Sequence, residues 1–402
     1  MEFAVQWLPE TAVPGAPTKG AGYHLLAKIC LANCEFDKAI TAATSVIDGP
    51  YALMTTRFGS YASDPAFNVM WDLCRWENKN IPENTETILA IVDRYTDPPD
   101  AKSAGSWALR FYNPCYWFGG RIRDSQGLPG TVAEGWTYRN YGRSGAECMM
   151  TDYVWKDIWA YGGDTWNNTS DLRRADTNWV DESELLYNNP TSVDYGKPIN
   201  VEYFADPNDS LWLVNPIWFN KVWVEDNNPS ETPVGSNADW YVFRLAETYL
   251  LRAEAYFWKG QTGPAANDIN MVRQRAEAIP VSAGDVTLDF IFAERTRELW
   301  IEEMRHNELV RAAFIQAKLN LNGYSLAAFS QNNWCYDKIM RDNIIHANKP
   351  SWLGRTPDMS PHHALWPIHD QVITANTGAV INQNIGYVGA ENNIPPLETI
   401  ED

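Results

Sequence analysis

The sequence contains no long apolar run and comparatively few positive charges. Its 402 residues carry 32 Lys and Arg against 51 Asp and Glu, which gives a formal net charge of −19. Because so acidic a surface repels phosphate backbones and anionic lipid headgroups, we expect no nucleic-acid binding. No stretch reaches the roughly 18 consecutive apolar residues of a transmembrane helix, so we expect none. The N-terminus, MEFAVQWLPETAVPG, lacks the features of a signal peptide, which indicates either a cytosolic chain or a targeting segment absent from this sequence.

Metal-binding and catalytic motifs are also missing. The six cysteines are scattered, with no CxxC pair and no Cys/His cluster at zinc spacing, so we expect packing roles for them. No HExxH, GxSxG, P-loop or GxGxxG motif is present, and we expect no enzyme, no catalytic residues, no metal and no cofactor. Adjacent carboxylates such as Glu302 and Glu303 could form a glycosidase dyad, but among 51 acidic residues such neighbours arise by chance. His362 and His363 could bind a metal, although surface placement is the simpler interpretation.

What the sequence has in excess is tryptophan. Its 19 Trp, 19 Tyr and 14 Phe make 13% of the chain aromatic. Eleven of the 19 Trp lie between residues 101 and 240. Such rings can either fill a core or face a ligand, and the count does not decide between the two.

Two segments that flank this Trp-rich region repeat each other. The first, KGAGYHLLAKICLANCEFDKAITAATSVIDGPY, predicts two helices around a turn at Asn33–Glu35, ended by Gly49 and Pro50. The second, RLAETYLLRAEAYFWKGQTGPAANDINMVRQRA, matches it at a separation of 226 residues, so that Ala27 corresponds to Ala253. The spacing of small residues, Tyr, Gly and Ile is that of a tetratricopeptide hairpin, in which small side chains let two helices approach closely.

The chain between the repeats has a different amino-acid composition. It is rich in Gly, Asn, Asp and aromatics and broken by turn signals, so we expect irregular loops with short strands and short helices. A third helical stretch, LDFIFAERTRELWIEEMRHNELVRAAF, follows the second repeat, and its Glu302/Arg305 and Glu308/Arg311 pairs suit an exposed helix face. We therefore predict a mainly α fold, a tetratricopeptide-like helical-repeat scaffold with a large loop-rich insertion. The expected parts are a repeat hairpin and following segment at 18–95, the aromatic-rich insertion at 96–240, a repeat hairpin and following helices at 241–325, and a loop-rich C-terminal segment at 326–402.

The segments RLAETYLLRAEAYFWKG, NDINMVRQRA, ERTRELWIEEMRHNELVR and LWPIHDQVITANTGAVINQNIGY, in that order, resemble the SusD/RagB family. The first repeat hairpin and NKNIPENTETILAIV are similar to it as well, so the resemblance covers the chain from about Thr18 to Tyr387. Members of this family are surface glycan-binding lipoproteins of Bacteroidota. The resemblance implies that this sequence lacks the family's N-terminal portion, which carries the lipoprotein signal, the acylated Cys and a first repeat region.

The resemblance also implies a binding protein rather than an enzyme. Family members form a lid over a SusC-like TonB-dependent outer-membrane transporter, catch oligosaccharides and pass them to the channel. For this chain we accordingly expect oligosaccharide or polysaccharide binding, a surface-exposed location at the outer membrane, and membrane attachment only through a lipid anchor absent from this sequence. The family's glycan site is carried by variable loops, so no family binding residue transfers to a numbered position here.

Candidate sugar-binding residues come instead from composition. Pyranose rings present flat C–H faces that stack on Trp and Tyr, and hydroxyl edges that hydrogen-bond to polar side chains. The segment from Glu134 to Asn168 combines both kinds of residue. Trp166, in the loop GGDTWNN, is the first candidate for an exposed stacking platform because its sequence neighbours are not apolar. The candidate glycan-binding residues are Trp166, Trp136, Tyr138, Tyr141, Trp159, Tyr161 and Asn167.

A second function remains open, that of a helical-repeat adaptor that binds another protein and no sugar. Repeat scaffolds bind peptides in a concave groove, which would place exposed aromatics on the helices, whereas the surplus here lies in the insertion. Trp258, Trp300 and Trp366 lie in repeat or terminal motifs, where we expect them in the core. The sequence does not indicate which glycan is bound or whether calcium takes part.

Overall fold

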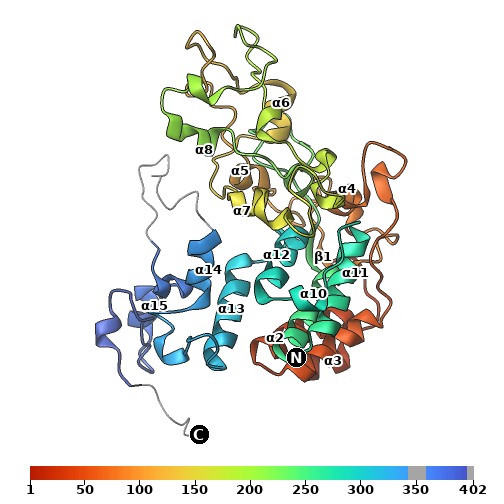
Figure 1. The fold of residues 1–402 in the computed structure, drawn as a ribbon, viewed down its shortest axis with the longest axis vertical. Helices are drawn as coiled ribbons and strands as arrows, with labels where there is room; N and C mark the ends of the chain where they lie inside the picture. The colour runs from red at the N-terminus through yellow and green to blue at the C-terminus, as the bar shows by residue number, and fades with distance from the viewer. Residues whose placement is uncertain (343–358, 396–402) are drawn as a thin grey trace. The chain divides into compact units, whose positions relative to one another are not determined.

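The computed structural model describes residues 1–342 and 359–395. These residues form two compact units, one of residues 1–302 and one of residues 303–342 and 359–395. Both units are mainly helical, as the sequence predicts (Figure 1). The helices are α1 (Glu2–Trp7), α2 (Lys19–Ala32), α3 (Phe36–Ile47), α4 (Val69–Cys74), α5 (Ala108–Tyr112), α6 (Gly135–Tyr141), α7 (Asp152–Trp155), α8 (Ser210–Leu213), α9 (Phe219–Val222), α10 (Leu245–Trp258), α11 (Thr262–Arg275), α12 (Leu288–Leu299), α13 (Arg305–Lys318), α14 (Trp334–Asp342) and α15 (Asp370–Ala375), and the strands are β1 (Thr87–Ile91) and β2 (Trp240–Arg244).

The two predicted repeats fold as helical hairpins, α2 with α3 and α10 with α11. The Thr18 hydroxyl starts α2 by accepting a hydrogen bond from the Ala21 amide, and α2 ends at the predicted turn. Gly260 ends α10 at φ 72°, a backbone conformation that glycine adopts without strain. Ala27 and Ala43 are 1% and 0% exposed, respectively. Because these side chains are small, the helices of the first hairpin approach each other closely.

The hairpins pack against each other although 226 residues separate matching positions. α10 contacts both α2 and α3. Arg252 on α10 donates to the Thr44 hydroxyl of α3 at 2.9 Å and to Asp268 of α11 at 2.7 and 2.8 Å. The repeat scaffold is therefore assembled from two distant stretches of chain.

A two-stranded antiparallel sheet explains how the insertion fits between adjacent repeats. β1 follows the first hairpin and β2 directly precedes α10, and Leu89 pairs with Phe243 while Ile91 pairs with Trp240. The chain thus leaves the scaffold along β1 and returns beside it along β2. Because its two ends meet, the insertion does not force the hairpins apart.

Within the insertion the elements are short, as the sequence predicts, and helices α5 to α9 are joined by 3-10 turns and loops. Tryptophan supplies much of its interior. Trp155, Trp159, Trp179 and Trp218 form one buried cluster, in which the rings of Trp179 and Trp218 stack with centroids 4.6 Å apart. Of the eleven Trp between residues 101 and 240, five are buried, four are half-buried and two are exposed. Nine of these eleven rings are therefore wholly or partly buried, and two face solvent.

The prediction of an exposed face on the third helical stretch is wrong. The stretch breaks into α12 and α13. Glu302 pairs with Lys221 and Arg244 instead of Arg305, and its side chain is 11% exposed. The Glu308–Arg311 pair does form, at 2.8 Å, but its side chains are only 7% and 10% exposed. These charges are buried because distant parts of the chain, which the spacing does not reveal, cover them.

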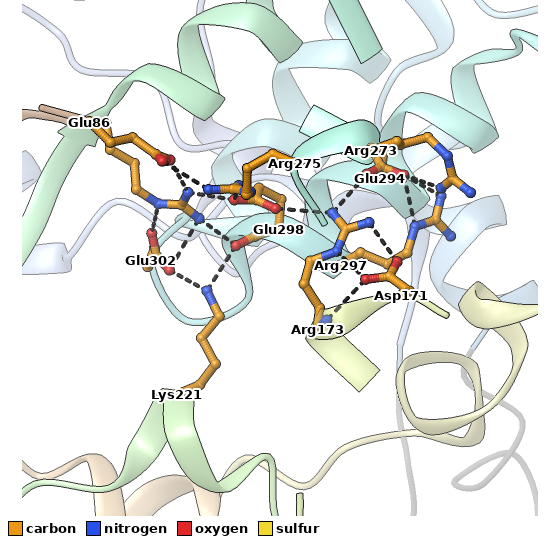
Figure 2. Close-up of polar contacts among 11 residues, drawn as sticks. Glu86, Asp171, Arg173, Lys221, Arg273, Arg275, Glu294, Arg297, Glu298 and Glu302 are labelled. Carbon is orange, nitrogen blue, oxygen red and sulfur yellow. Dashed lines mark hydrogen bonds and ion pairs between the residues drawn. The ribbon is translucent and has the colours of Figure 1, made fainter. Parts of the chain in front are cut away.

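One buried network of ion pairs, the core ion network, joins the repeats, the sheet and the insertion (Figure 2). Glu298 on α12 accepts hydrogen bonds from Arg275 of α11, Arg244 of β2 and Arg173 of the insertion. Glu294, one turn earlier, accepts from Arg173 at 2.8 Å and from two further arginines. The network contains the acids Glu86, Asp171, Glu294, Glu298 and Glu302 and the bases Arg173, Lys221, Arg244, Arg273, Arg275 and Arg297.

Arg173 and Lys221 are the insertion's cations in this network. Arg173 reaches both Glu294 and Glu298, and Lys221 reaches Glu302 and the Glu298 carbonyl. Since a buried charge needs compensating partners, losing any of these contacts weakens the charge compensation in the interior. The network therefore fixes the insertion on the repeat scaffold.

The second unit contains α13 and α14, followed after the gap by α15. Trp366 lies here with 73% of its side chain exposed, so the expectation that it is buried in the core is wrong. Trp258 and Trp300 are half-buried. None of the helices in the described residues is both long and apolar enough to cross a membrane.

Candidate functional site

Trp136 and Tyr138 lie on the short helix α6 of the insertion. Trp136 is 65% exposed, and its ring meets that of Tyr141 edge-on at 5.8 Å, while Tyr138 is half-buried. Gly142 ends the helix at φ 80°, where a Cβ atom would lie 2.6 Å from Leu109. This close approach fixes the end of α6 against α5, so Trp136 projects from an anchored helix.

The polar side chains of α6 attach it to the segment 223–231. Arg139 donates to the Asp226 carboxylate at 3.1 Å and to the Glu231 carbonyl at 2.6 Å. The Asn140 side-chain oxygen accepts from the Trp223 indole N–H at 2.8 Å. While these contacts hold the polar side chains of α6, the Trp136 ring stays largely exposed to solvent.

Tyr161, Trp166 and Asn167 lie together in the loop that follows α7. The loop is closed by two backbone hydrogen bonds of 3.1 Å between Thr165 and Asn168. Asn167 is exposed and accepts from the Thr165 hydroxyl at 2.8 Å. Tyr161 donates to Asp285 at 2.9 Å, and partial burial together with this hydrogen bond raises the pKa of its phenol.

Trp166 is half-buried rather than free of apolar neighbours. Trp155 of α7 contacts it with ring centroids 5.4 Å apart, and the Arg174 guanidinium lies 5.3 Å from its ring centroid. The neighbours come from other segments, so the loop sequence does not reveal them. Trp166 is therefore a supported ring with part of its surface in solvent.

Two candidates are excluded by burial. Tyr141 is 9% exposed, and burial raises its pKa to about 12. Trp159 is 3% exposed and meets Trp179 and Trp218 edge-on at 6.1 and 5.6 Å. Neither presents a ring face to a sugar, so both are removed from the candidate set. Their burial follows from ring contacts with residues far along the chain, which composition does not show.

The remaining candidates form two groups, Trp136 with Tyr138 on α6, and Tyr161 with Trp166 and Asn167 in the loop. No hydrogen bond or ring contact between the described residues of these groups joins them. Each group combines aromatic rings with polar neighbours, which is the composition that a pyranose site needs.

The sequence analysis did not identify a third pair of aromatic residues. Trp107, just before α5, is 52% exposed and Phe111 on α5 is 37% exposed, and their ring centroids are 5.8 Å apart. Between them Arg110 pairs with Glu147 at 3.4 Å. The spacing of four residues between two aromatics is a signal for a shared helix face. It did not distinguish an exposed face from a buried one.

A metal site is not assembled in the described part of the chain. No group of three or more His, Cys, Asp or Glu there could hold a metal ion. His362 and His363 lie against each other and against Tyr387, with ring centroids 4.2 to 6.1 Å apart, and both are half-buried. Glu302, named above for a dyad, belongs to the core ion network.

Comparisons with known proteins agree with this architecture. Residues 150–387 match the model of the SusD family. The starch-binding protein SusD of Bacteroides thetaiotaomicron is 32% identical over 344 residues, which cover 80% of this chain and 58% of that protein. The chain thus spans less than two thirds of the length of this relative.

Solved structures show the same fold at lower identity. A SusD-like protein from Bacteroides fragilis has a TM-score of 0.55 at 18% identity, covering 96% of this chain and 69% of its own. Surface glycan-binding protein A from Bacteroides thetaiotaomicron, in complex with laminarihexaose, has a TM-score of 0.52 at 18% identity, covering 95% and 68%. The family match covers more than half of the sequence, and this chain belongs to the SusD family.

Proposed function

We propose that this chain is a glycan-binding protein that captures oligosaccharides at the cell surface and delivers them to a TonB-dependent outer-membrane transporter. Membership of the SusD family supports binding rather than catalysis, since the relative with 32% identity is named for binding starch. The observation that carries the proposal is Trp136, whose 65% exposed indole stands on an anchored helix of the insertion. An exposed ring of this size stabilises a folded chain little, whereas it offers a platform for a sugar.

The proposed binding residues are Trp136 and Tyr138 on α6 and Tyr161, Trp166 and Asn167 in the following loop. The rings stack on the C–H faces of pyranoses, and Asn167 hydrogen-bonds to hydroxyl groups at their edges. Because the chain carries a net charge of −19, a neutral glycan fits better than a polyanionic one.

The transporter partner and the location are proposed from the family alone. They are a SusC-like protein and the outer membrane, with attachment through a lipid anchor. The alternative, a helical-repeat adaptor, requires exposed aromatics on the repeat helices. The described repeat helices α2, α3, α10 and α11 carry no exposed aromatic, whereas Trp107 and Trp136 in the insertion are exposed.

Affinity electrophoresis against a panel of neutral and acidic polysaccharides tests the proposal. We expect a neutral glycan to retard the wild-type protein, and Trp136→Ala or Trp166→Ala to weaken the retardation. Trp136→Ala should leave the midpoint of thermal unfolding unchanged, whereas Trp166→Ala should lower it because the half-buried ring packs against Trp155. Trp7→Ala is the matched control, because Trp7 is 74% exposed but lies on α1, outside the insertion. If both insertion variants migrate like the wild type on a glycan that retards it, the proposed residues are wrong. If no glycan retards the wild type, the adaptor function is favoured.

A further inference from the structure

Trp166 is contacted by two side chains that share one carboxylate. Arg174 lies 5.3 Å from the Trp166 ring centroid, and the Trp155 ring lies 5.4 Å from it at an angle of 53°. Asp181 accepts hydrogen bonds from both neighbours, from Arg174 Nη2 at 2.9 and 3.1 Å and from the Trp155 indole N–H at 3.1 Å. We call Trp155, Arg174 and Asp181 the Trp166 support.

The Trp166 support is itself held in the interior of the insertion. Arg174 and Trp155 are 3% and 8% exposed, respectively. Each of these two side chains also packs against a further neighbour, which limits its movement. The Arg174 guanidinium lies 4.6 Å from the Trp179 ring centroid, and the Lys156 ammonium lies 3.9 Å from the Trp155 ring centroid. A buried guanidinium needs its carboxylate, so Asp181 determines where Arg174 lies. Asp181 therefore influences the position of Trp166 indirectly, through its hydrogen bonds to Arg174 and Trp155.

The support consists of side chains from three separate places in the chain. Trp155 ends α7, Arg174 lies in the 3-10 turn Leu172–Arg174, and Asp181 caps the 3-10 turn Glu182–Glu184. The loop that carries Trp166 lies between the first two. Two of these segments thus contact the half-buried ring, and the third holds both of them through Asp181.

We propose that Asp181 and Arg174 are positioning residues that hold the Trp166 indole with part of one face open to a pyranose ring of the bound glycan. This proposal rests on the proposed function and deepens it. A ring held in its bound orientation before the ligand arrives loses little conformational freedom on binding, and affinity rises for that reason. Without Asp181, Arg174 loses its carboxylate partner and its place beside the ring.

The test is Asp181→Asn, with Asp209→Asn as a matched control. Asp209 lies in the same insertion and makes the same two kinds of contact, accepting from the Trp212 indole N–H at 3.0 Å and from Arg121 at 2.9 Å. Its partners are not the side chains that contact Trp166. We expect Asp181→Asn to weaken binding of the retarding polysaccharide about fivefold in isothermal titration, and to cause no further loss in a Trp166→Ala background, because coupled residues are not additive. Asp209→Asn should bind like the wild type.

Fluorine NMR of 5-fluorotryptophan-labelled protein gives a readout that needs no glycan. The Trp166 resonance is identified by its loss in Trp166→Phe. We expect Asp181→Asn to shift or broaden that resonance and Asp209→Asn to leave it unchanged. If Asp181→Asn does not fold, Trp155→Phe takes its place as the test variant. It removes the indole N–H donor while keeping an aromatic ring, and we expect it to move the Trp166 resonance.

Two results would overturn the proposal. One is an Asp181→Asn protein whose Trp166 resonance is unmoved. The other is the same fold-loss of affinity in the wild-type and Trp166→Ala backgrounds, which would mean that Asp181 acts independently of Trp166. Failure of the proposed function is separate from both, because it shows as no polysaccharide binding by the wild type while the resonance still responds.

Discussion

Replacing Glu298 by Gln tests whether the core ion network holds the insertion on the repeat scaffold. The Glu298 side chain is fully buried and accepts from three guanidinium groups, those of Arg275, Arg244 and Arg173. Gln has the same shape and keeps one acceptor oxygen. Its NH2 group, however, directs two N–H donors at the N–H donors of the surrounding arginines. The three arginines keep other carboxylates, since Arg275 and Arg244 pair with Glu86 and Arg173 pairs with Asp171. The substitution therefore removes one negative charge that all three share and places N–H donors among their guanidinium groups.

The expected cost follows from this geometry. Removing one partner of a buried ion pair destabilises a protein by about 3–5 kcal/mol. Because Gln keeps one acceptor and the arginines keep other carboxylates, we expect the lower end, about 3 kcal/mol of unfolding free energy for the unit of residues 1–302. The same change at an exposed pair should have almost no effect. Glu35→Gln is the matched control, since Glu35 pairs with Lys38 at 2.7 Å and both side chains are more than a third exposed.

Urea denaturation followed by far-ultraviolet circular dichroism measures both variants. We expect Glu298→Gln to lower the urea midpoint with an unchanged slope, and Glu35→Gln to unfold like the wild type. A loss smaller than about 1 kcal/mol for Glu298→Gln would refute the reasoning, because the network would then tolerate the loss of a carboxylate that three buried arginines share. A larger effect in the control than in Glu298→Gln would refute it as well.

Two more predictions concern protons and thiols. Burial by itself would raise the pKa of Glu294, but Arg173, Arg297 and Arg273 hold it well below its usual value. Its stabilisation is therefore complete above the unfolded-state pKa of about 4.3 and is lost as the pH falls further. The urea midpoint should accordingly stay level from about pH 7 to 5 and fall below about pH 4, and a level midpoint down to about pH 3 would contradict this. Burial raises the pKa of the Cys115 thiol to about 12 and that of Cys335 to about 11, whereas Cys148 is exposed, so Ellman's reagent at pH 8 should label Cys148 first. Equal labelling rates for the three thiols in the folded protein would count against the burial of the first two.

The sequence was sufficient for the parts of the fold that depend on local pattern. The helices of the first repeat, Lys19–Ala32 and Phe36–Ile47, end at the turn that Asn33–Glu35 predicts. Their apolar and small residues recur at helical spacing, so neighbours along the chain are also neighbours in space. The short, turn-broken elements of the insertion were predictable for the same reason.

Burial of individual side chains was not predictable. Trp159 and Tyr141 looked like ligand-facing residues in a polar, aromatic stretch, yet distant rings cover both. Trp366 showed the opposite error, since a position expected in the core is 73% exposed. Composition counts rings but does not say which segments return to cover them.

The sequence by itself determined the repeat, its helices, the place of the insertion and the resemblance to the SusD family. Each of these depends on the order and spacing of residues along one stretch of chain. The tertiary structure decided which charges and rings are buried and which face solvent. Glu298 and Arg173, 125 residues apart, meet in the core ion network, and Arg174 and Trp155 both contact Trp166. Such contacts depend on how the insertion leaves along β1 and returns along β2, because only closure of that loop brings distant segments to the same place.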